Sequence, residues 1–484
     1  MTTEHFDVII VGAGLSGIGA ACHLQDKCPG KSYVILENRQ SMGGTWDLFR
    51  YPGIRSDSDM HTLGYSFKPW RASKAIADGP SILSYIKETA AENDIDRHVR
   101  YGHLVSKANW SSEDASWTVE ARCGDDPVTV RGNVLLMCAG YYSYKAGYLP
   151  VFEGRERFRG DIVHPQEWPE DLDYGGKRIV IIGSGATAVT LLPELAEEAG
   201  HVVMLQRSPT YMISWPDTDP VANVLRRLLP ERTAYAITRW KNIQIQRWIY
   251  RYSRRSPDKA RKLLINWVRK ELPPDYDVEK HFTPDYDPWD QRLCLVPNSD
   301  LFRAVSSGKA SIVTDEVATI TENGIRLKSG EHLDAEIIVT ATGLNLVVLG
   351  EVELVVDDEP VDYPNTFSYK GIMISGVPNM VSTFGYINAS WTLRADLVAE
   401  YVCRLVNHMD QTGARQCTPR LRDSDRDMKP QPWVTGFSSG YIQRVMEELP
   451  KQGDREPWLN PQNYLGDKPR FLDAPLDDGV LEHR

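Results

Sequence analysis

Several features that define common protein classes are missing from this sequence. Its seven cysteines include no C-x-x-C pair. Cys22 and Cys28 lie six apart, which is the wrong interval for the C-x-x-x-x-C disulfide of two-dinucleotide disulfide reductases. Reduced thiols, and with them a cytoplasmic location, fit this pattern best. No group of histidines, cysteines and carboxylates has metal-ligand spacing, so we expect no metal site.

Targeting signals and an excess of positive charge are also missing. No signal peptide precedes the first strand, and the apolar run "FDVIIVGAG" is far too short to span a membrane. The net charge of −11 argues against nucleic acid as a general partner. Apolar residues make up 42% of the 484 positions, which is enough for two or three domains with full cores.

Two glycine-rich turns are the most informative features that are present. Each follows an apolar strand, in "FDVIIVGAGLSG" and "RIVIIGSGATA", and each precedes a helix-like stretch. Glycine lets the backbone approach a pyrophosphate, and the helix dipole favours its negative charge. The residues that form the turns are Gly12, Gly14 and Gly17 in the first and Gly183, Gly185 and Ala188 in the second.

The residue that ends the next strand differs in charge between the two units. Glu37 follows Gly17 by 20 residues, and an acid there suits the free ribose 2′-hydroxyl of FAD or NAD. Arg207 follows Ala188 by 19 residues and is succeeded by Ser208, and an arginine there suits the 2′-phosphate of NADP. The sequence therefore predicts an α/β protein with two Rossmann-like domains, binding FAD first and NADPH second.

Two similar strand patterns indicate that the second domain is nested in the first. Residues 104–140 predict three short strands and then an apolar run, and residues 311–343 repeat this plan around an Asn-Gly turn. The predicted ranges are 1–144 and 344–484 for the FAD domain, 145–220 and 288–343 for the NADPH domain, and 221–287 for a helical insertion.

The insertion is strongly basic. Residues 221–270 contain fourteen Lys or Arg and two acids, a net charge of +12. Apolar residues recur there at helical spacing, for example Ile245, Trp248, Ile249 and Tyr252. One interpretation is a helical cap whose arginines are solvated or paired with the acidic remainder. The other is peripheral contact with a membrane surface or an acidic partner.

The segment between the two turns carries a further motif. "FRGDIVHPQEW" places Phe158, Gly160, His164 and Trp168 in an F-x-G-x-x-x-H-x-x-x-W pattern, and it closely resembles the fingerprint of type I Baeyer–Villiger monooxygenases. The resemblance extends over nearly the whole chain, to the ethionamide-activating branch of that family. The segments that carry it include "GGTWDLFRYPGIRSDSDM", "WDQRLCLVPNSDLF", "ATGLN" and "GYINASWTLRADL".

This resemblance implies an activity and assigns roles. It implies an enzyme that holds FAD, consumes NADPH and inserts one oxygen atom of dioxygen next to a ketone carbonyl through a C4a-peroxyflavin, and that also sulfoxidises thioethers or thioamides. Arg292 matches the active-site arginine, and Asp57 matches the carboxylate that positions it, although Asp59 is close by. Gly44, Thr45 and Trp46 match the segment that lines the flavin.

The same resemblance leaves some questions open. His164 and Trp168 couple domain rotation to cofactor state in this interpretation, with a plain structural role for His164 as the alternative. Gln291 stands where many family members have a lysine that assists with the 2′-phosphate, so Arg207 and Ser208 carry more of the NADPH preference. The expected substrate is a small apolar ketone or thioether, with Trp433 or Phe437 as candidate pocket residues.

Other functions remain as alternatives. A flavin-containing monooxygenase acting mainly on sulfur or nitrogen is the nearest, and Trp168 with Arg292 favours carbonyl chemistry over it. A disulfide reductase or NADH dehydrogenase is disfavoured by the missing cysteine pair. A non-enzymatic redox sensor would not need Arg292 and Asp57.

Overall fold

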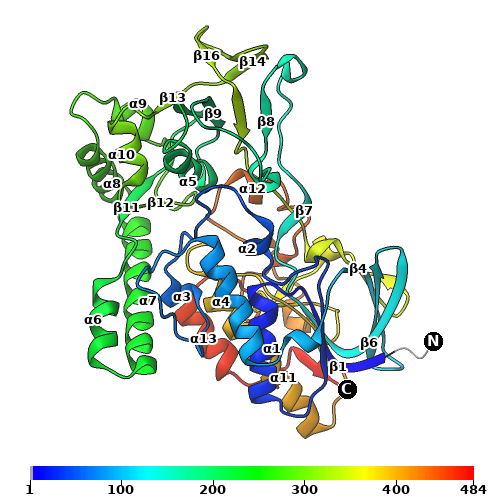
Figure 1. The fold of residues 1–484 in the computed structure, drawn as a ribbon. Coiled ribbons are helices and arrows are strands. Elements are labelled where there is room, and N and C mark those ends of the chain that lie inside the picture. Colours follow the sequence, from blue (N-terminus) through cyan, green and yellow to red (C-terminus); the bar gives the residue numbers. More distant parts are fainter. Residues whose placement is uncertain (1–3) are drawn as a thin grey trace.

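Each glycine turn follows an interior strand of its own sheet in the computed structural model, which describes residues 4–484 (Figure 1). We call the part built on the larger sheet the first unit and the part built on the five-stranded sheet the second unit. The chain enters the second unit after the first part of the first unit and later returns. The predicted α/β fold with two nested Rossmann-like units is thereby confirmed.

The first unit contains a nine-stranded sheet of mixed direction, in the order β20-β19-β4-β5-β6-β1-β2-β3, with β23 also paired to β6. Its strands are β1 (Glu4–Val11), β2 (Tyr33–Leu36), β3 (Val99–Arg100), β4 (His103–Ser111), β5 (Ser116–Cys123), β6 (Asp126–Met137), β19 (Glu353–Val356), β20 (Glu359–Pro360) and β23 (Met380–Ser382). The pairs β1–β2, β1–β6 and β2–β3 are parallel, whereas β4, β5 and β6 form an antiparallel meander.

One detail of this sheet differs from the sequence prediction. The third short strand and the apolar run that was expected to follow it form the single strand β6. Gly132 lies within this strand and does not interrupt it. The strand passes so close to β1 at this position that a Cβ would lie 2.7 Å from Ile9. The glycine therefore serves close packing of two strands and does not make a turn.

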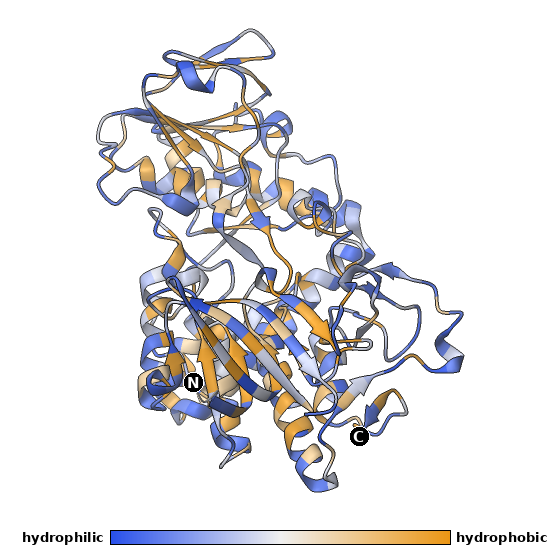
Figure 2. Ribbon diagram, turned by 90° about the vertical axis from the view of Figure 1, so that its right-hand side faces the viewer, coloured by the Kyte–Doolittle hydropathy of each residue, from blue (hydrophilic) through white to orange (hydrophobic). Residues whose placement is uncertain are grey.

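Helices cover this sheet and bury its apolar residues. The helices of the first unit are α1 (Leu15–Lys27), α2 (Thr45–Leu48), α3 (Met60–Leu63), α4 (Gly79–Glu92), α11 (Trp391–Thr412), α12 (Gly440–Gln443) and α13 (Tyr464–Leu472). Helix α1 packs on α11, and residues of α1, α4 and α11 share one apolar core with β1 and β2. In Figure 2 the strands at the centre of each unit are strongly apolar and the outer loops hydrophilic.

The second unit is a parallel five-stranded sheet with a small antiparallel sheet beside it. The parallel sheet has the order β13-β10-β9-β17-β8, and the small sheet is β14-β15-β16. Its strands are β8 (Asp161–Val163), β9 (Arg178–Ile182), β10 (His201–Gln206), β13 (Ala310–Thr314), β14 (Val317–Thr321), β15 (Gly324–Leu327), β16 (His332–Asp334) and β17 (Ile337–Thr340). Helices α5 (Ala186–Leu195) and α10 (Asp300–Ser306) pack on it.

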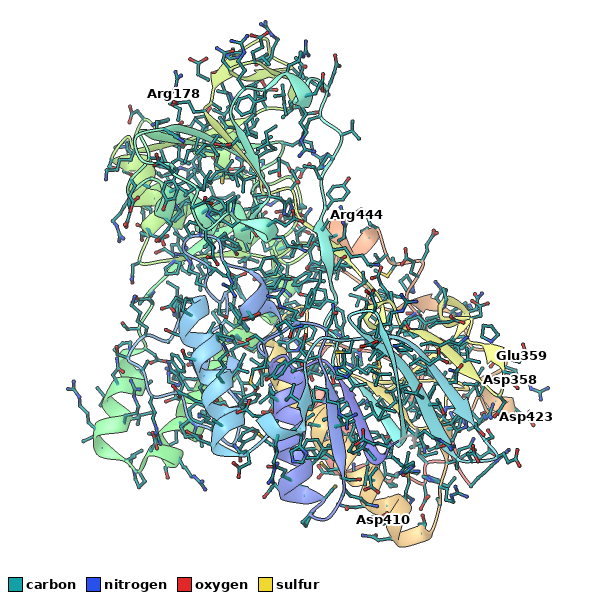
Figure 3. All side chains as sticks on the ribbon, turned by 45° about the vertical axis from the view of Figure 1, so that its right-hand side comes forward. Arg178, Asp358, Glu359, Asp410, Asp423 and Arg444 are labelled. Atoms are coloured by element: carbon teal, nitrogen blue, oxygen red, sulfur yellow. The ribbon has the colours of Figure 1, made fainter. Side chains whose placement is uncertain are left out.

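Two short strands carry the chain between the units. Strand β7 (Tyr142–Gly147) leads out of the first unit, β18 (Leu344–Leu346) leads back, and the two pair in antiparallel fashion. Arg444, the C-cap residue of α12, contacts this ribbon: its guanidinium lies 3.7 Å from the ring centre of Tyr148 and donates a hydrogen bond to the carbonyl of Leu344 (Figure 3). We call the pair β7 and β18 the connecting ribbon.

The basic insertion is divided between the units. It consists of α6 (Pro220–Leu228), α7 (Glu231–Arg255), α8 (Pro257–Glu271) and α9 (Val278–Phe282). Apolar residues of α8 and α9 belong to the core of the second unit, whereas Tyr235 of α7 belongs to the core of the first. The break between α7 and α8 falls at Ser256, since proline at the next position disfavours helical geometry in the residue before it.

A buried arginine fastens α7 to the first unit. Arg239 donates to the carbonyl groups of His61, Thr62 and Gly64 and pairs with the carboxylate of Asp396 at 3.3 Å. Because both charges are buried and well hydrogen-bonded, this contact sets the position of α7 on the first unit. The insertion is therefore not simply an appendage of the second unit, and the residue boundaries predicted for the domains stay predictions.

Short strand pairs complete the chain. They are β11 (Met212–Trp215) with β12 (Cys294–Pro297), β21 (Ser368–Tyr369) with β22 (Met373–Ile374), β24 (Cys417–Pro419) with β27 (Leu481–His483), and β25 (Gln431–Pro432) with β26 (Lys451–Gln452). Of the helices in the described chain, none is at once long and apolar enough to cross a membrane.

Candidate active site

A cavity of about 510 Å³ lies between the two units. Its walls come from the first glycine turn, from the segment 43–58, from the connecting ribbon and from the N-terminus of α5 in the second unit. Arg292, which precedes β12, reaches the same cavity. The cavity thus brings together two dinucleotide-binding elements and the predicted catalytic arginine.

The first glycine turn requires glycine at two of its positions. Gly12 has φ +104°, and a Cβ there would lie 2.5 Å from the carbonyl oxygen of Cys138. A Cβ on Gly17 would lie 1.9 Å from the oxygen of Gly12 itself. Gly14 is the N-cap of α1 and lines the cavity, so the helix N-terminus opens onto it. This geometry fits a pyrophosphate held against the backbone.

Glu37 lies at the end of β2 with its side chain almost fully buried. Its carboxylate accepts hydrogen bonds from the backbone N–H of Ala13 at 2.7 Å and of Arg39 at 2.8 Å. Burial raises the pKa of Glu37, and the two N–H donors oppose that rise. The carboxylate lines the cavity beside the turn and has acceptor capacity left, which fits the ribose hydroxyls of FAD.

The segment that was predicted to line the flavin does lie along the cavity. Gly44, Thr45 and Trp46 begin helix α2 there. Gly44 has φ +55° and approaches the first glycine turn so closely that a Cβ would be 3.1 Å from the Cα of Gly14. A larger residue at position 44 would push this segment away from the turn.

Arg292 is held in a ring of tyrosines. Arg292 lines the cavity and is partly exposed there, whereas its Nε atom is buried and has no hydrogen-bond partner within residues 4–484. Burial alone would lower the pKa of Arg292. The nearby oxygens of Tyr441, Tyr141 and Tyr142, followed by the carboxylate of Asp57, have a larger effect, so the pKa of Arg292 is above its usual value. The guanidinium is therefore a fixed positive charge facing the cavity.

Of the two neighbouring aspartates, Asp57 lines this cavity and Asp59 does not. The side chain of Asp57 is open to the cavity. The surrounding protein nevertheless displaces water from the carboxylate and so raises the pKa of Asp57, whereas the positive charges of Arg292 and Arg55 oppose that rise. No ion pair joins Asp57 to Arg292 in the part of the chain that the structure describes, so the two act on each other across the cavity. Asp59 instead caps α3 and accepts from two side-chain amides of α7.

The second glycine turn leads into α5, whose residues Ala186 and Thr187 line the cavity, although Gly183 and Gly185 themselves do not. A Cβ on Gly183 would lie 2.2 Å from the oxygen of Ala341, and Gly185 is the N-cap of α5, in which Ala188 is buried. Arg207 and Ser208 follow β10 with exposed side chains. Among residues 4–484 the Arg207 side chain has neither an ion pair nor a hydrogen bond. An exposed, unpaired arginine next to this turn fits the 2′-phosphate of NADPH.

The fingerprint residues connect the second unit to the ribbon. Phe158 and Trp168 pack against its two apolar clusters, and Gly160 allows β8 to approach β17, since a Cβ would lie 2.1 Å from the carbonyl of Glu336. His164 contacts β7 and the residue directly before β18: its Nε2 lies 3.2 Å from the oxygen of Gly343, and its ring occupies the space where a Cβ of Gly147 would lie. Burial lowers the pKa of His164, and the Gly343 carbonyl opposes this.

Sequence reasoning missed the tyrosines and the aromatic wall beside them. Tyr141 and Tyr142 share a hydrogen bond at 2.8 Å between their hydroxyls, and Tyr141 stacks on Trp391, which lines the cavity. The doublet directly after the apolar run of β6 was a usable signal, because ligands bind at the carboxyl ends of such strands. Trp433 packs on Phe384 next to Trp391, and Phe437 lies in the same cluster, so both support the wall from behind.

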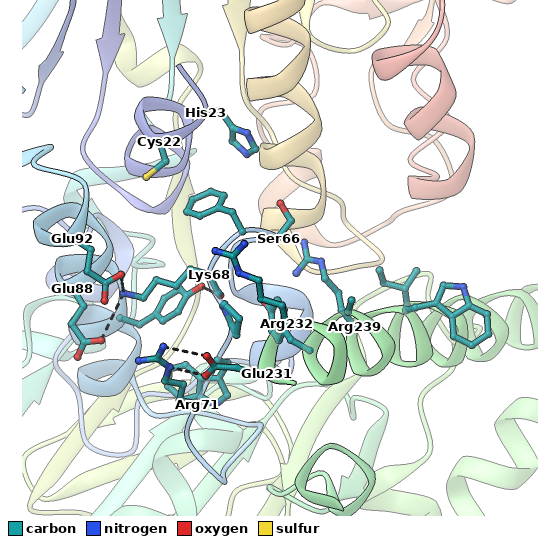
Figure 4. Close-up of a pocket in the computed structure, with 18 of the residues that line it drawn as sticks. Cys22, His23, Ser66, Lys68, Arg71, Glu88, Glu92, Glu231, Arg232 and Arg239 are labelled. Carbon is teal, nitrogen blue, oxygen red and sulfur yellow. Dashed lines mark hydrogen bonds and ion pairs between the residues drawn. The ribbon is translucent and has the colours of Figure 1, made fainter. Parts of the chain in front are cut away.

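A larger groove of about 1500 Å³ lies elsewhere, between α4, α7 and α13 (Figure 4). Its charged groups largely pair with one another, as Arg71 does with Glu231 and Lys68 with Glu92. Neither glycine turn reaches it. This groove is the larger of the two, but the smaller cavity contains the first glycine turn and Arg292, so we assign the active site to the smaller cavity.

Comparison with known proteins agrees with this geometry. The flavin-binding monooxygenase-like family matches residues 73–259, and the NAD(P)-binding Rossmann-like domain matches residues 10–76. The FAD-containing monooxygenase EthA of Mycobacterium tuberculosis is 54% identical over 99% of this chain and 98% of its own length. EthA of Mycolicibacterium smegmatis is 53% identical over 96% and 94%.

Solved structures give the same picture. An oxidized steroid monooxygenase bound to NADP is 25% identical, with a TM-score of 0.73 over 86% of this chain and 87% of its own. An open structure of cyclohexanone monooxygenase shares the fold, with a TM-score of 0.76 over the full length of both chains at 18% identity.

The resemblance inferred from the motifs is thus confirmed. By its full-length identity to these relatives, the chain belongs to the family of FAD-containing monooxygenases represented by EthA, flavoprotein oxidoreductases that use FAD and NADPH.

Proposed function

We propose that this monooxygenase inserts oxygen into small apolar ketones, giving esters or lactones, and also oxidises the sulfur of thioethers and thioamides. The observation that carries the proposal is Arg292, a partly exposed guanidinium that lines the cavity shared by the FAD turn and α5. Attack on a carbonyl carbon builds negative charge on oxygen. A fixed cation at that point lowers the barrier to the attack.

When bound, FAD takes up hydride from NADPH and activates dioxygen. The residues of the chain do the rest. Gly12, Gly14 and Glu37 hold the cofactor, Arg292 supplies positive charge at the reacting oxygen, and Asp57 keeps a carboxylate within electrostatic reach of that arginine. The tyrosines beside Arg292 fix the position of its side chain and close this end of the cavity from water.

The aromatic wall supports an apolar substrate. Trp391 and Tyr141 are stacked with ring centres 5.1 Å apart, and Phe384 and Trp433 continue the wall away from the cavity. Such a surface gains free energy by excluding water from an alkyl or aryl group. It offers few hydrogen-bond partners, which fits a ketone or thioether recognised by its apolar parts.

His164 acts in this proposal as a positioning residue between cofactor sites. It extends from the second unit and touches β7 and the residue directly before β18 of the connecting ribbon, which also forms part of the cavity wall. A change in the second unit on binding NADPH therefore reaches the ribbon through this side chain.

The helical hairpin of α6 and α7 supports contact with an anionic membrane surface. Of its large apolar residues, Leu228 is 74% exposed and Trp240 and Trp248 are each 64% exposed. Eight of the fourteen basic residues in 221–270 make no ion pair or side-chain hydrogen bond within the described chain. Exposed tryptophans beside unpaired cations are typical of surfaces that lie on anionic lipid.

Arg292→Ala tests the proposed reaction. The parent enzyme is expected to convert a methyl ketone to an ester. The variant should keep FAD, whose binding residues are untouched, but form ester at least about a thousandfold more slowly, because a preorganised charge worth several kcal/mol is lost. Electrons from NADPH should leave as hydrogen peroxide instead. The measurement is ester and peroxide formed per NADPH consumed.

Three further enzymes sharpen that experiment. Arg292→Lys should recover little, since a flexible ammonium does not reproduce a planar guanidinium. Asp57→Ala should show a milder loss of coupling, and Arg159→Ala, an exposed arginine of the second unit, should match the parent. A parent enzyme that oxidises a matched thioether but never the ketone would replace the proposal with heteroatom oxidation. Ester formation at parental yield in Arg292→Ala would remove the role of that residue.

Arg207→Ala should weaken the use of NADPH by about tenfold to 150-fold, the loss of a charge-assisted contact worth about 1.5–3 kcal/mol. Kinetics with NADH should scarcely change, because NADH has no 2′-phosphate. The test is kcat/KM for both cofactors. Equal losses with NADPH and NADH would show that Arg207 is structural.

His164→Ala should retain FAD and thermal stability but lower the product formed per NADPH several-fold, with peroxide making up the difference. His201→Ala, a change to a histidine on β10 of the same unit, serves as the control. Coupling and kcat are the informative readouts. If the variant loses only its melting temperature and stays fully coupled, His164 is a structural linker residue.

Co-sedimentation with vesicles of anionic phospholipid tests the membrane proposal. Binding is expected at low salt and should be reversed at high salt, because the attraction amounts to about 1 kcal/mol per nearby basic residue and is screened. The double variant Leu228→Ser/Trp248→Ser should bind at least about tenfold more weakly through lost apolar burial. Leu421→Ser, another exposed leucine, is the control. No binding at low salt would leave α6 and α7 as a helical cap.

A further inference from the structure

Two histidines and an aspartate meet near the end of the chain, far from the cavity. His408 lies in the last turns of α11, Asp477 in the loop after α13, and His483 at the end of β27. One ligand atom from each lies within 4.8 Å of the others. This group is not visible as a motif, because its members are widely separated along the chain and come together only when β27 pairs with β24.

The distances within this group are long for hydrogen bonds. The Nε2 of His408 lies 3.3 Å from Oδ1 of Asp477, and the Nε2 of His483 lies 3.4 Å from the same oxygen. A charge-assisted hydrogen bond between an imidazolium and a carboxylate is shorter, about 2.7–2.9 Å. Within residues 4–484, Nε2 of His408 and both ring nitrogens of His483 are buried without a hydrogen-bond partner.

The two histidine-to-aspartate distances match those between neighbouring ligands of a tetrahedral metal site, and the two histidines offer ligand nitrogens within 4.8 Å of each other. When bonds to the metal are about 2.0–2.1 Å, neighbouring ligand atoms lie about 3.3–3.4 Å apart in a tetrahedron. In an octahedron with the same bond lengths they lie only about 2.8–3.0 Å apart, so the spacing favours Zn²⁺ over the six-coordinate iron that two histidines and a carboxylate also bind.

We propose that His408, Asp477 and His483 bind a zinc-class divalent cation that fastens β27 to the end of α11. The side chains of both histidines are largely shielded, at 19% and 16% exposure, whereas that of Asp477 is 72% exposed. The cation therefore enters from the Asp477 side and keeps water as its fourth ligand. None of the three residues lines the active-site cavity, so the role is structural.

Zinc binding by the FAD-loaded, full-length enzyme without a histidine tag tests this assignment. One Zn²⁺ per chain should bind, raise the melting temperature and be removed by EDTA, with no change in NADPH consumption. Co²⁺ in its place should give the visible absorption of a tetrahedral site. His408→Ala, His483→Ala and the surface variant Asp477→Asn should each weaken binding by at least about tenfold.

His332→Ala provides the matched control. His332 and Asp334 form a pair of similar spacing, 3.2 Å, but the structure brings no second histidine to it. This variant should bind Zn²⁺ like the parent. The assignment is overturned if the parent binds no Zn²⁺, or if binding and the melting-temperature rise persist unchanged in Asp477→Asn and in the histidine variants.

Discussion

The antiparallel pairing of β7 with β18 is the interaction on which the rest of the structure depends. Both strands that take the chain between the two units pass through it, and Tyr142, Tyr144 and Leu344 of these strands line the active-site cavity. The ribbon thus connects the two units and also forms part of the wall of the active-site cavity. The two cofactor sites belong to different sheets, so their relative position depends on the geometry of this ribbon. Arg444 and His164 both contact the ribbon and help to hold it in place.

Much of the fold follows from local sequence. Both glycine turns, and Glu37 and Arg207 at their expected distances, could be placed because strand, turn and helix are contiguous and their spacing is fixed by geometry. Local reasoning failed where the third short strand and the apolar run after it were expected to be separate. They form the single strand β6, in which Gly132 allows a close approach to β1, and only the partner strand reveals this.

Only part of the candidate site could be predicted from the sequence. Arg292 and Asp57 stood out because a family resemblance marks them, but their surroundings come from distant segments. Tyr441 reaches Arg292 from α12, and the two-histidine group at the C-terminal strand assembles from three elements. The division of the insertion was equally hidden, since α7 and α8 have similar composition and differ only in which core their apolar faces meet.

That division has a mechanical consequence. Arg239 fixes α7 to the first unit, while β11 and α8 are packed into the second, so the chain crosses between the units before α6 and again at Ser256, as well as at the ribbon. Attachments that lie apart oppose rotations that a single attachment would allow. A change in the relative position of the cofactor domains therefore also has to bend the chain at both ends of the hairpin formed by α6 and α7.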